Sequence, residues 1–390
     1  MAAATADFLV IGAGMAGASA AARLAEGRRV IVLEAEDQPG YHSTGRSAAL
    51  FSETYGNAAI RILTHAGRGF YEDRAGGLAD YPVLSPRGVL VFAMPGQEGL
   101  LDDDPDDPAP PDPTVRRLDA AASCALVPVL RPEIVVAAIH EPGAMDIDVH
   151  GLHGAYLRLL RRHGGRLVTG APVVGLSHTG GIWTAATPAG EFAAPVVVNA
   201  AGAWADHVAA LAGLPPVGIV PKRRTALIVA APPGVDVGSW PLVIDAAETG
   251  YFKPEAGKLL VSPADETPVA PSDVQPDELD IAIALDRLIQ RTTIAVHHVE
   301  RKWAGLRSFA IDKTPVVGFD PLASGFFWLA GQGGYGIQTA EGLARSAAML
   351  IGAGILPADI AAAGLDPRTL SPVRFRQSPI EIASSLRSSQ

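Results

Sequence analysis

The 390-residue sequence contains a single cysteine, Cys124, so no intramolecular disulfide can form. It also lacks an apolar run of about 18 residues, the length that a membrane-spanning helix needs. The residues before Asp7 do not have the basic start of a secretion signal. These absences argue against a disulfide scaffold and a membrane span, and they favour a reducing, cytoplasmic location.

Positive charge is scarce as well. The chain has 31 Lys and Arg against 41 Asp and Glu, a formal net charge of -10, and no segment concentrates its basic residues. Nucleic acid and an anionic membrane are therefore unfavoured as partners. With 48% hydrophobic and 18% charged residues, the chain is long enough to bury one or two sizeable cores.

The most informative segment that is present lies near the N-terminus. An apolar strand is expected at 8–11, followed by the turn Gly12-Ala13-Gly14-Met15-Ala16-Gly17 and an alanine-rich helix over about 15–25. A second strand, 29–33, ends in Glu34. Glycines permit close approach of a pyrophosphate to a helix N-terminus, and an acid at this distance binds ribose hydroxyls. The pattern predicts binding of an ADP-containing dinucleotide; a glycine-rich turn without a ligand is the alternative.

Nucleotide-type elements recur along the chain, separated by strand-rich blocks. Helices are expected at 58–73, from Asp148 to about 163, at 276–290 and up to about 351, with strands at 88–92, 166–168, 182–185, 196–202 and 326–330. This alternation predicts two interleaved domains with boundaries near residues 80, 146, 216 and 310.

Four further segments carry a family signal together with the N-terminal turn. They are residues 40–49 (GYHSTGRSAA), 197–204 (VVNAAGAW), 303–307 (WAGLR) and 331–339 (GQGGYGIQT). The chain resembles, over nearly its whole length, the superfamily of FAD-dependent D-amino-acid oxidases and dehydrogenases. Within that superfamily it is most similar to bacterial D-arginine-type dehydrogenases, which share the Tyr-His-Ser-Thr-Gly-Arg-Ser, Pro-Lys-Arg-Arg and Gln-Gly-Gly-Tyr-Gly-Ile-Gln-Thr runs.

The resemblance implies an α/β fold in which a Rossmann-like FAD-binding domain is interleaved with an α+β substrate domain built on a mainly antiparallel sheet. The FAD-binding domain would comprise residues 1–80, 146–215 and 310–390, and the substrate domain residues 81–145 and 216–309. The FAD would be bound non-covalently, because covalent attachment would need a cysteine near the flavin in the C-terminal half, which has none.

The resemblance also implies which residues contact FAD. Gly12, Gly14, Ala16 and Gly17 would hold the diphosphate and Glu34 the ribose; Thr44, Gly45, Arg46, Ser47 and Ala49 would line the flavin and its phosphates; Val173 would lie near the adenine, Ala201 and Gly202 near the dinucleotide, and Gly334, Tyr335, Gly336, Ile337, Gln338 and Thr339 at the pyrimidine edge of the flavin. A glycine loop that opens a helix offers free amide donors and about half a positive charge, which favours negative charge on the reduced ring.

Two arginines are the candidate ligands of the substrate. Arg223 and Arg224 are adjacent in an expected strand, so only one of them can point into a cavity. The resemblance selects Arg224 and implies a catalytic set of Tyr55, Arg224, Tyr251, Arg307 and Gly334. Two guanidiniums from different segments suit bidentate capture of an α-carboxylate. Surface arginines paired with nearby acids are the alternative.

The implied reaction is the oxidative deamination of a D-amino acid. A hydride moves from Cα to flavin N5, and water converts the imino acid to a 2-oxo acid and ammonia. No side-chain base is required, because the α-amine only has to lose its proton first. The partners would be the amino acid and an electron acceptor, a quinone or another carrier. The alternatives are a glycine or N-methyl-amino-acid oxidase, a 2-hydroxy-acid dehydrogenase and a non-catalytic FAD-binding protein.

Two departures from the arginine-type pattern bear on the substrate. Leu50 stands where that pattern has histidine, and residues 85–89 (SPRGV) lack the acid expected after Ser-Pro-Arg. Leu50 and Phe51 are expected to make the entrance apolar. Since an unpaired buried cation is costly, a neutral or hydrophobic D-amino acid is predicted over D-arginine. Glu53 and Glu248 are acids that could restore recognition of a cation.

No metal site is predicted. His150, His153, His297 and His298 do not bring enough ligands together and are interpreted as surface or interface histidines. Cys124, in an apolar stretch, is interpreted as a small buried hydrophobic residue. The acidic, proline-rich run 101–113 is expected to be a solvated loop rather than a calcium site.

Overall fold

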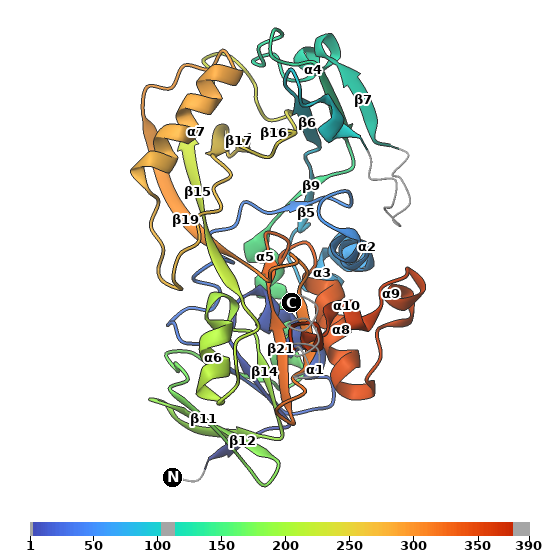
Figure 1. Cartoon of the computed structure of the whole chain (residues 1–390), viewed down its shortest axis with the longest axis vertical. Coiled ribbons are helices and arrows are strands. Elements are labelled where there is room, and N and C mark those ends of the chain that lie inside the picture. The colour runs from blue at the N-terminus through green and yellow to red at the C-terminus, as the bar shows by residue number, and fades with distance from the viewer. Residues whose placement is uncertain (1–2, 103–113, 377–390) are drawn as a thin grey trace, which may run out of the picture.

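The chain folds into two lobes, each built around its own large sheet (Figure 1). The computed structural model describes residues 3–102 and 114–376. The lower lobe in Figure 1 holds a six-stranded sheet, and the upper lobe most of a nine-stranded sheet, whose long strands β15 and β19 reach down between the lobes. Most of the predicted acidic loop, residues 103–113, lies outside the described residues.

The N-terminal β-α-β unit has the predicted form. Strand β2 (Phe8–Ile11) leads through the glycine turn into α1 (Met15–Leu24), and β3 (Val30–Leu33) follows. Both strands are almost completely buried, and the alanines of α1 let the helix pack closely on the sheet. The elements at the start of the chain are therefore confirmed nearly to the residue.

The six-stranded sheet brings distant segments of the chain together. Its order is β10 (Arg166–Val168), β3, β2, β14 (Val196–Asn199), β21 (Phe326–Ala330) and β20 (Val316–Phe319). The first five strands run parallel, and β20 is antiparallel to β21. Because the strands are parallel, their carboxyl ends meet at one edge of the sheet, which is where ligands bind in open α/β sheets.

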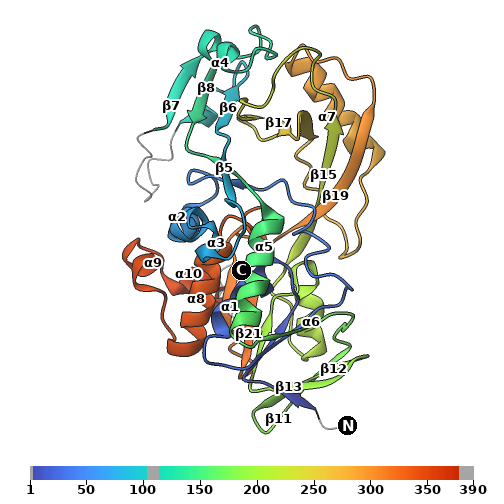
Figure 2. The ribbon, with the colours of Figure 1, turned by 180° about the vertical axis from the view of Figure 1, so that it is seen from behind.

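Helices cover one face of this sheet and a smaller sheet covers the other. Helices α1, α5 (Val149–Arg162) and α8 (Ala340–Ala353) pack together on the first face (Figure 2). As predicted, Asp148 caps α5, since its carboxylate accepts a hydrogen bond from the Gly151 N–H at 2.9 Å. The second face carries the four-stranded sheet β1 (Ala4–Thr5), β13 (Gly190–Ala194), β12 (Ile182–Thr187) and β11 (Gly175–Thr179), with α6 (Ala205–Leu211) beside it.

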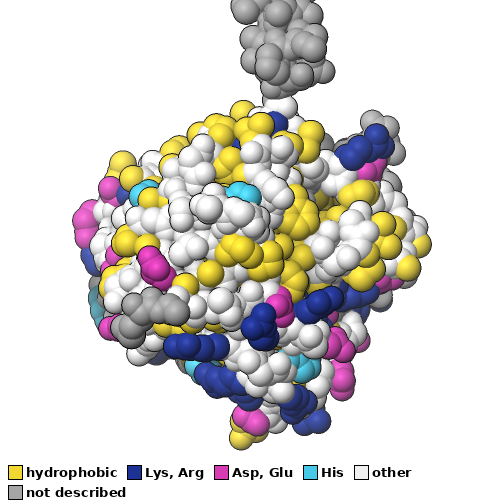
Figure 3. All heavy atoms as spheres, turned by 90° about the horizontal axis from the view of Figure 1, so that it is seen from below, with side chains coloured by type: hydrophobic (Ala, Val, Ile, Leu, Met, Phe, Trp, Pro, Cys, Tyr) yellow, Lys and Arg dark blue, Asp and Glu magenta, His cyan; other side chains and the backbone are white. Residues whose placement is uncertain are grey.

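The lower end of the molecule shows how charge is distributed on that side. In Figure 3, Lys and Arg side chains gather along one part of the face, with Asp and Glu side chains between them. This end therefore does not present a uniformly positive surface to a polyanion.

The nine-stranded sheet is mainly antiparallel, as predicted. Its order is β22 (Gln332–Gly333), β19 (Val299–Phe309), β15 (Val220–Val229), β18 (Lys258–Ser262), β17 (Tyr251–Glu255), β16 (Leu242–Asp245), β6 (Val89–Ala93), β8 (Ala137–Glu141) and β7 (Arg116–Asp119). Every neighbouring pair is antiparallel except β16 and β6. Helix α7 (Glu278–Arg291) packs on the sheet and buries Ile281, Ala284 and Leu288.

Short elements connect the two lobes. Strands β4 (Leu50–Phe51), β9 (Met145–Ile147) and β5 (Leu84–Pro86) form a three-stranded sheet at the junction. Five further helices and three 3-10 turns complete the fold of the described residues: α2 (Ala58–Glu72), α3 (Arg74–Gly77), α4 (Ala120–Leu126), α9 (Ala358–Ala362), α10 (Pro367–Leu370) and the 3-10 turns Glu98–Leu101, Gly202–Trp204 and Pro372–Phe375. The four predicted domain boundaries stay a prediction.

Candidate functional site

A large cavity of about 690 Å³ runs from the carboxyl edge of the parallel sheet to one face of the nine-stranded sheet. Loops after all the strands β2, β3, β10, β14 and β21 contribute to its wall. A cavity of this size is in the range of ligand sites in proteins. The predicted dinucleotide and substrate residues thus share one continuous space.

The glycine turn shapes one end of the cavity. Gly12 has a φ of +99°, and a Cβ there would lie 2.5 Å from the carbonyl oxygen of Ala200, so the turn tolerates no side chain at this position. The buried Glu34 carboxylate accepts hydrogen bonds from the N–H groups of Ala13 at 2.7 Å and Glu36 at 3.0 Å. The acid is therefore held beside the turn, where a ribose would lie.

The segment from Thr44 to Ala49 connects this turn to the nine-stranded sheet. Thr44 Oγ1 accepts a hydrogen bond from the Met15 N–H at 2.9 Å, at the start of α1. The Arg46 guanidinium donates to the carbonyl oxygen of Ala304 at 3.2 Å and forms an ion pair with Asp273. Because protein groups already hold Arg46, it stiffens the wall of the cavity in addition to lining it.

Most of the predicted cofactor residues line the cavity: Gly12, Gly14, Ala16, Glu34, Thr44, Arg46, Ser47, Ala49, Val173, Ala201, Gly202, Gly334, Gly336, Ile337 and Gln338. The other four, Gly17, Gly45, Tyr335 and Thr339, are not among the lining residues. Gly17 lets α1 approach the turn, since a Cβ there would be 1.9 Å from the Gly12 carbonyl oxygen. Thr339 is buried and its hydroxyl donates to the Tyr335 carbonyl oxygen at 2.8 Å.

His153 corrects one prediction. It was expected on a surface or interface, but it is buried inside α5, and its Nε2 lies 2.9 Å from the carbonyl oxygen of Ala13. Burial lowers the pKa of His153, so the ring favours its neutral form. His153 thus supports the glycine turn from behind. Cys124 is partly buried rather than fully buried.

The other end of the cavity contains the predicted arginines. Arg224 lines the cavity, whereas its neighbour Arg223 points away and pairs with Asp280 of α7 at 2.7 Å. Arg224 Nε donates to the carbonyl oxygen of Asp265 at 2.9 Å. The alternation of side chains along β15 therefore separates the two arginines, which was the expectation from their adjacency.

Arg307 lies beside Arg224 on the neighbouring strand β19. Arg224 is paired with Gly305 across β15 and β19, which places Arg307 two residues further along. A Cβ at Gly334 would lie 2.8 Å from Arg307 Nη1, so the absence of a side chain at this glycine leaves room for the guanidinium. Burial, followed by the charge of Arg307, lowers the pKa of Arg224. An anion between the two groups would relieve this repulsion.

Two tyrosines adjoin the arginines. Burial alone would raise the pKa of Tyr251, but the charges of Arg307 and Arg224 outweigh it and lower that pKa below the usual value. The ring of Tyr55 packs against that of Tyr335 in a tilted arrangement, with centroids 5.0 Å apart and an angle of 58° between the ring planes. For Arg307, the interactions with Tyr55 and Tyr251 outweigh burial and raise the pKa. The guanidinium therefore stays charged.

The sheet face next to the arginines is apolar. Val89 pairs with Leu242, and Val91 with Ile244, across β6 and β16, and all four side chains line the cavity together with Leu50. Phe51, expected at the entrance with Leu50, is instead in the core, 1% exposed. This is a correction, and its reason is the alternation of β4, which turns neighbouring side chains to opposite sides.

Of the two acids named as possible cation ligands, only Glu248 lines the cavity. Glu53 instead forms an ion pair with Arg68 of α2, and its carboxylate lies 2.6 Å from Nδ1 of His65 on the same helix. Sequence reasoning missed another acid, Glu141, which is 4% exposed and lines the cavity at the end of β8. No local motif marks Glu141; it reaches the site because β8 pairs with β6 and sets Glu141 opposite Val89.

The donor set fits the predicted FAD. One end of the cavity has a glycine turn, a helix N-terminus and a buried carboxylate, which suit the pyrophosphate and ribose of a dinucleotide. Within residues 3–102 and 114–376, no group of three or more His, Cys, Asp or Glu is placed to hold a metal ion. In the same residues, no helix has the length and apolar character to cross a bilayer.

Comparison with known proteins agrees with this fit. A family model described as DAO, FAD dependent oxidoreductase, matches residues 7–350. The uncharacterized oxidoreductase YurR of Bacillus subtilis is 24% identical over 88% of this chain and 94% of its own length. FAD-dependent oxidoreductase domain-containing protein 1 of Xenopus laevis is 32% identical over 40% of this chain, which spans only 34% of that protein.

Solved structures share the fold. L-proline dehydrogenase from P. horikoshii superimposes with a TM-score of 0.80 at 19% identity, covering 96% of this chain and 99% of that one. Glycine oxidase from Geobacillus kaustophilus has a TM-score of 0.78 at 22% identity, covering 94% and 98%. The mixed α/β fold, with both sheets, is therefore that of known flavoenzymes.

Proposed function

Because this chain belongs to the FAD-dependent oxidoreductase family, we propose that it is a dehydrogenase that oxidises the Cα–N bond of D-amino acids with neutral or hydrophobic side chains. The products would be imino acids, which water converts to 2-oxo acids and ammonia. The main support for this proposal is that Arg224 and Arg307 lie in the same cavity as the dinucleotide turn.

The residues of this chain bind and orient the substrate. Arg224 and Arg307 receive the α-carboxylate, and Tyr251 lies beside both guanidiniums. The Tyr55 and Tyr335 rings, packed against each other, would shield the arginine side from water. FAD, when bound, supplies the acceptor for the hydride. The protein therefore contributes positioning and desolvation, and the α-amine releases its proton before the transfer.

We call the lining residues Val89, Val91, Leu242, Ile244 and Leu50 the apolar row, and the proposed side chain of the substrate follows from them. Val89, Leu242 and Leu50 line the cavity beyond the arginines, where a cationic tail would lose its hydration. Two acids line this part of the cavity: Glu141 already accepts hydrogen bonds from residues 52–54, and Glu248 is exposed, so it would meet a charged tail only at the mouth. A D-leucine-like or D-phenylalanine-like substrate fits this lining better than D-arginine.

The D-configuration and the dehydrogenase activity rest on the resemblance to D-arginine-type dehydrogenases. The shared runs at 41–47, 221–224 and 332–339 all lie on or next to the cavity wall. We extend the proposal to the electron acceptor, a quinone or another carrier that takes electrons from the reduced flavin.

A glycine or N-methyl-amino-acid oxidase is a second candidate. It is favoured by the likeness of this fold to glycine oxidase, which shows shape alone at 22% identity. Such a substrate would leave the apolar row at Val89 and Leu242 unfilled. It is therefore the less favoured reading of the site.

Anaerobic bleaching of the flavin tests these proposals together. We expect D-leucine, D-methionine and D-phenylalanine to bleach the purified holoprotein faster than D-arginine or D-lysine, and the L-enantiomers to leave it oxidised. Faster bleaching by glycine, sarcosine or an L-amino acid would contradict the proposal. Peroxide formed in air, compared with reduction of a quinone or dye, separates oxidase from dehydrogenase.

A further inference from the structure

One buried carboxylate holds the segment that carries Tyr55. Glu141 Oε2 accepts hydrogen bonds from Ser52 Oγ and Thr54 Oγ1, both at 2.7 Å. Its Oε1 accepts a hydrogen bond from the backbone N–H of Glu53 at 3.2 Å. A single side chain from β8 thus fixes three consecutive residues that directly precede Tyr55.

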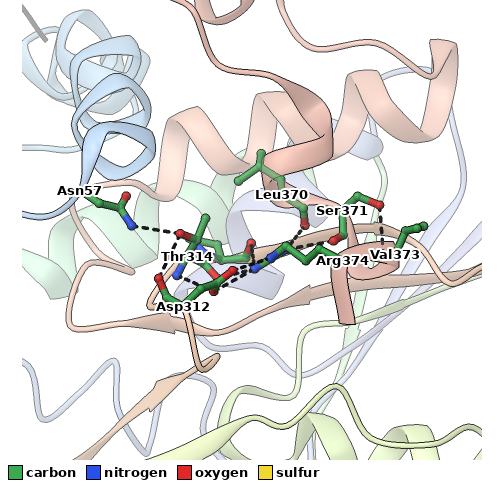
Figure 4. A network of polar contacts seen from close by, with 8 residues as sticks. Asn57, Asp312, Thr314, Leu370, Ser371, Val373 and Arg374 are labelled. Carbon is green, nitrogen blue, oxygen red and sulfur yellow. Dashed lines mark hydrogen bonds and ion pairs between the residues drawn. The ribbon is translucent and has the colours of Figure 1, made fainter. Parts of the chain in front are cut away.

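The far end of this segment is fixed as well. Asn57 caps α2 by accepting from the Ile60 N–H at 3.1 Å, and its Nδ2 donates to Thr314 Oγ1 at 2.9 Å. Figure 4 shows that Arg374 binds Asp312 and the backbone around Thr314. These contacts hold Thr314, the partner of Asn57, in place. Residues 52–57 are therefore anchored at both ends, with Tyr55 between the anchors.

The buried, apolar surroundings of Glu141 are unfavourable for a carboxylate. It sits opposite Val89 on the apolar face of the nine-stranded sheet and is 4% exposed. A buried charge is costly unless hydrogen bonds satisfy it, and a hydrophobic residue of similar size would avoid this cost. The hydrogen bonds from residues 52–54 offset the cost, so the carboxylate and that segment hold each other in place.

We propose that Glu141 is a positioning residue that holds residues 52–54 so that the Tyr55 ring lies against Tyr335 and next to Arg307. It acts on the substrate through Tyr55. The inference rests on the proposed function only in so far as Tyr55 and Arg307 contact the substrate. Replacement of Glu141 should therefore weaken substrate binding more than it changes the chemical step.

The first test compares Glu141→Gln with Asp320→Asn as holoproteins. Asp320 is a matched control, because it is also 4% exposed and accepts from three donors, the Leu322 N–H, Trp328 Nε1 and Arg376, yet it does not line the cavity. Both variants should lose thermal stability. Only Glu141→Gln should raise KM, by about tenfold, with kcat per bound flavin changed by less than about threefold.

A second measurement asks whether Glu141 acts through Tyr55. In a Tyr55→Ala background, Glu141→Gln should change KM by less than about twofold, since the residue that it positions is gone. If Glu141→Gln does not give folded holoprotein, the double variant Ser52→Ala, Thr54→Val removes two of the bonds from the other side and should raise KM in the same way. An equal rise in KM in the Tyr55→Ala background, or an equal effect of Asp320→Asn, overturns the proposal.

Amide hydrogen exchange separates this proposal from the proposed function. Residues 52–57 of the substrate-free holoprotein should exchange faster in Glu141→Gln than in wild type, and Asp320→Asn should leave this segment unchanged. A panel in which D-amino acids fail to bleach the wild type would contradict the proposed function and leave this measurement valid. Unchanged exchange in Glu141→Gln would overturn the role of Glu141 whatever the substrate.

Discussion

The two ends of the cavity are built in different ways. The dinucleotide end is made of short, continuous segments: the turn at 12–17, Glu34 and the run 44–49. The substrate end is made of side chains from strands far apart in the sequence, such as Arg224, Arg307 and Val89. The first end therefore depends on local conformation, and the second on the register of the nine-stranded sheet. Substitutions at the two ends should fail in different measurements.

Loss of an arginine should be the largest effect and should spare the cofactor. We expect Arg307→Ala to lower kcat/KM by about 30-fold to several thousand-fold, since truncating one partner of a buried charge contact costs ~2–5 kcal/mol. The flavin absorbance per protein should stay that of wild type. Arg223→Ala, whose side chain pairs with Asp280 outside the cavity, is the control and should keep kcat/KM within about threefold. Loss of flavin from Arg307→Ala would break the separation of the two ends.

The reverse pattern is expected at the glycine turn. Gly12→Ala should weaken FAD binding by about 5- to 160-fold, because strain in sparsely populated backbone conformations costs ~1–3 kcal/mol and a Cβ would meet the Ala200 carbonyl oxygen at 2.5 Å. Titration of the apoprotein with FAD, followed by flavin fluorescence, measures this. Gly27→Ala also has a positive φ but has no atom within 4 Å of the added Cβ, so it reports strain alone. Equal FAD affinities of the two variants would argue against the close approach.

A smaller, graded effect is expected on the apolar row. Val89→Thr should lower kcat/KM for D-leucine and D-phenylalanine by about 5- to 30-fold, since burying an unpaired hydroxyl costs ~1–2 kcal/mol. D-Alanine, whose methyl group is short, should be affected least. Val261→Thr, buried elsewhere in the same sheet and not lining the cavity, controls for stability. A uniform loss for all three substrates would mean that the row does not contact the side chain.

The smallest expected effect concerns pH and the support behind the glycine turn. Burial lowers the pKa of His153, so the unfolded chain binds this proton more readily than the folded protein. The stability contributed by the neutral ring is present above the unfolded value of about 6.5 and is lost as the pH falls through the folded pKa. The melting temperature of His153→Gln should fall less steeply between pH 7 and pH 5 than that of wild type. The exposed His298, which is not among the groups that shift the pKa of His153, is the control, and His298→Gln should follow wild type.

The sequence was most informative where structure is local. Strand β2, the turn and α1 follow from apolar runs, glycines and alanines that are adjacent in the chain, and Asp148 marks the start of α5 by its capping residue type. The choice between Arg223 and Arg224 needed only the alternation of a strand and the resemblance. Neither depends on knowing which strands pair.

The missed features depend on long-range pairing or on a misread face. Glu141 and Val89 become neighbours only through the register of β6 and β8. For His153 a local signal existed: its spacing of three and seven residues from the buried Tyr156 and Leu160 puts it on the buried side of α5. Phe51 was misplaced because β4 is only two residues long, too short for its alternation to be read from the sequence.

The cavity also has a consequence for how the protein responds to heat. Its wall is shared between the parallel sheet of one lobe and the antiparallel sheet of the other. A ligand filling it touches both lobes at once and binds only when they are assembled. The cofactor should therefore act as a crosslink between the lobes, and the melting temperature should keep rising with the logarithm of the free FAD concentration even after most sites are filled, so that thermal stability depends on cofactor supply.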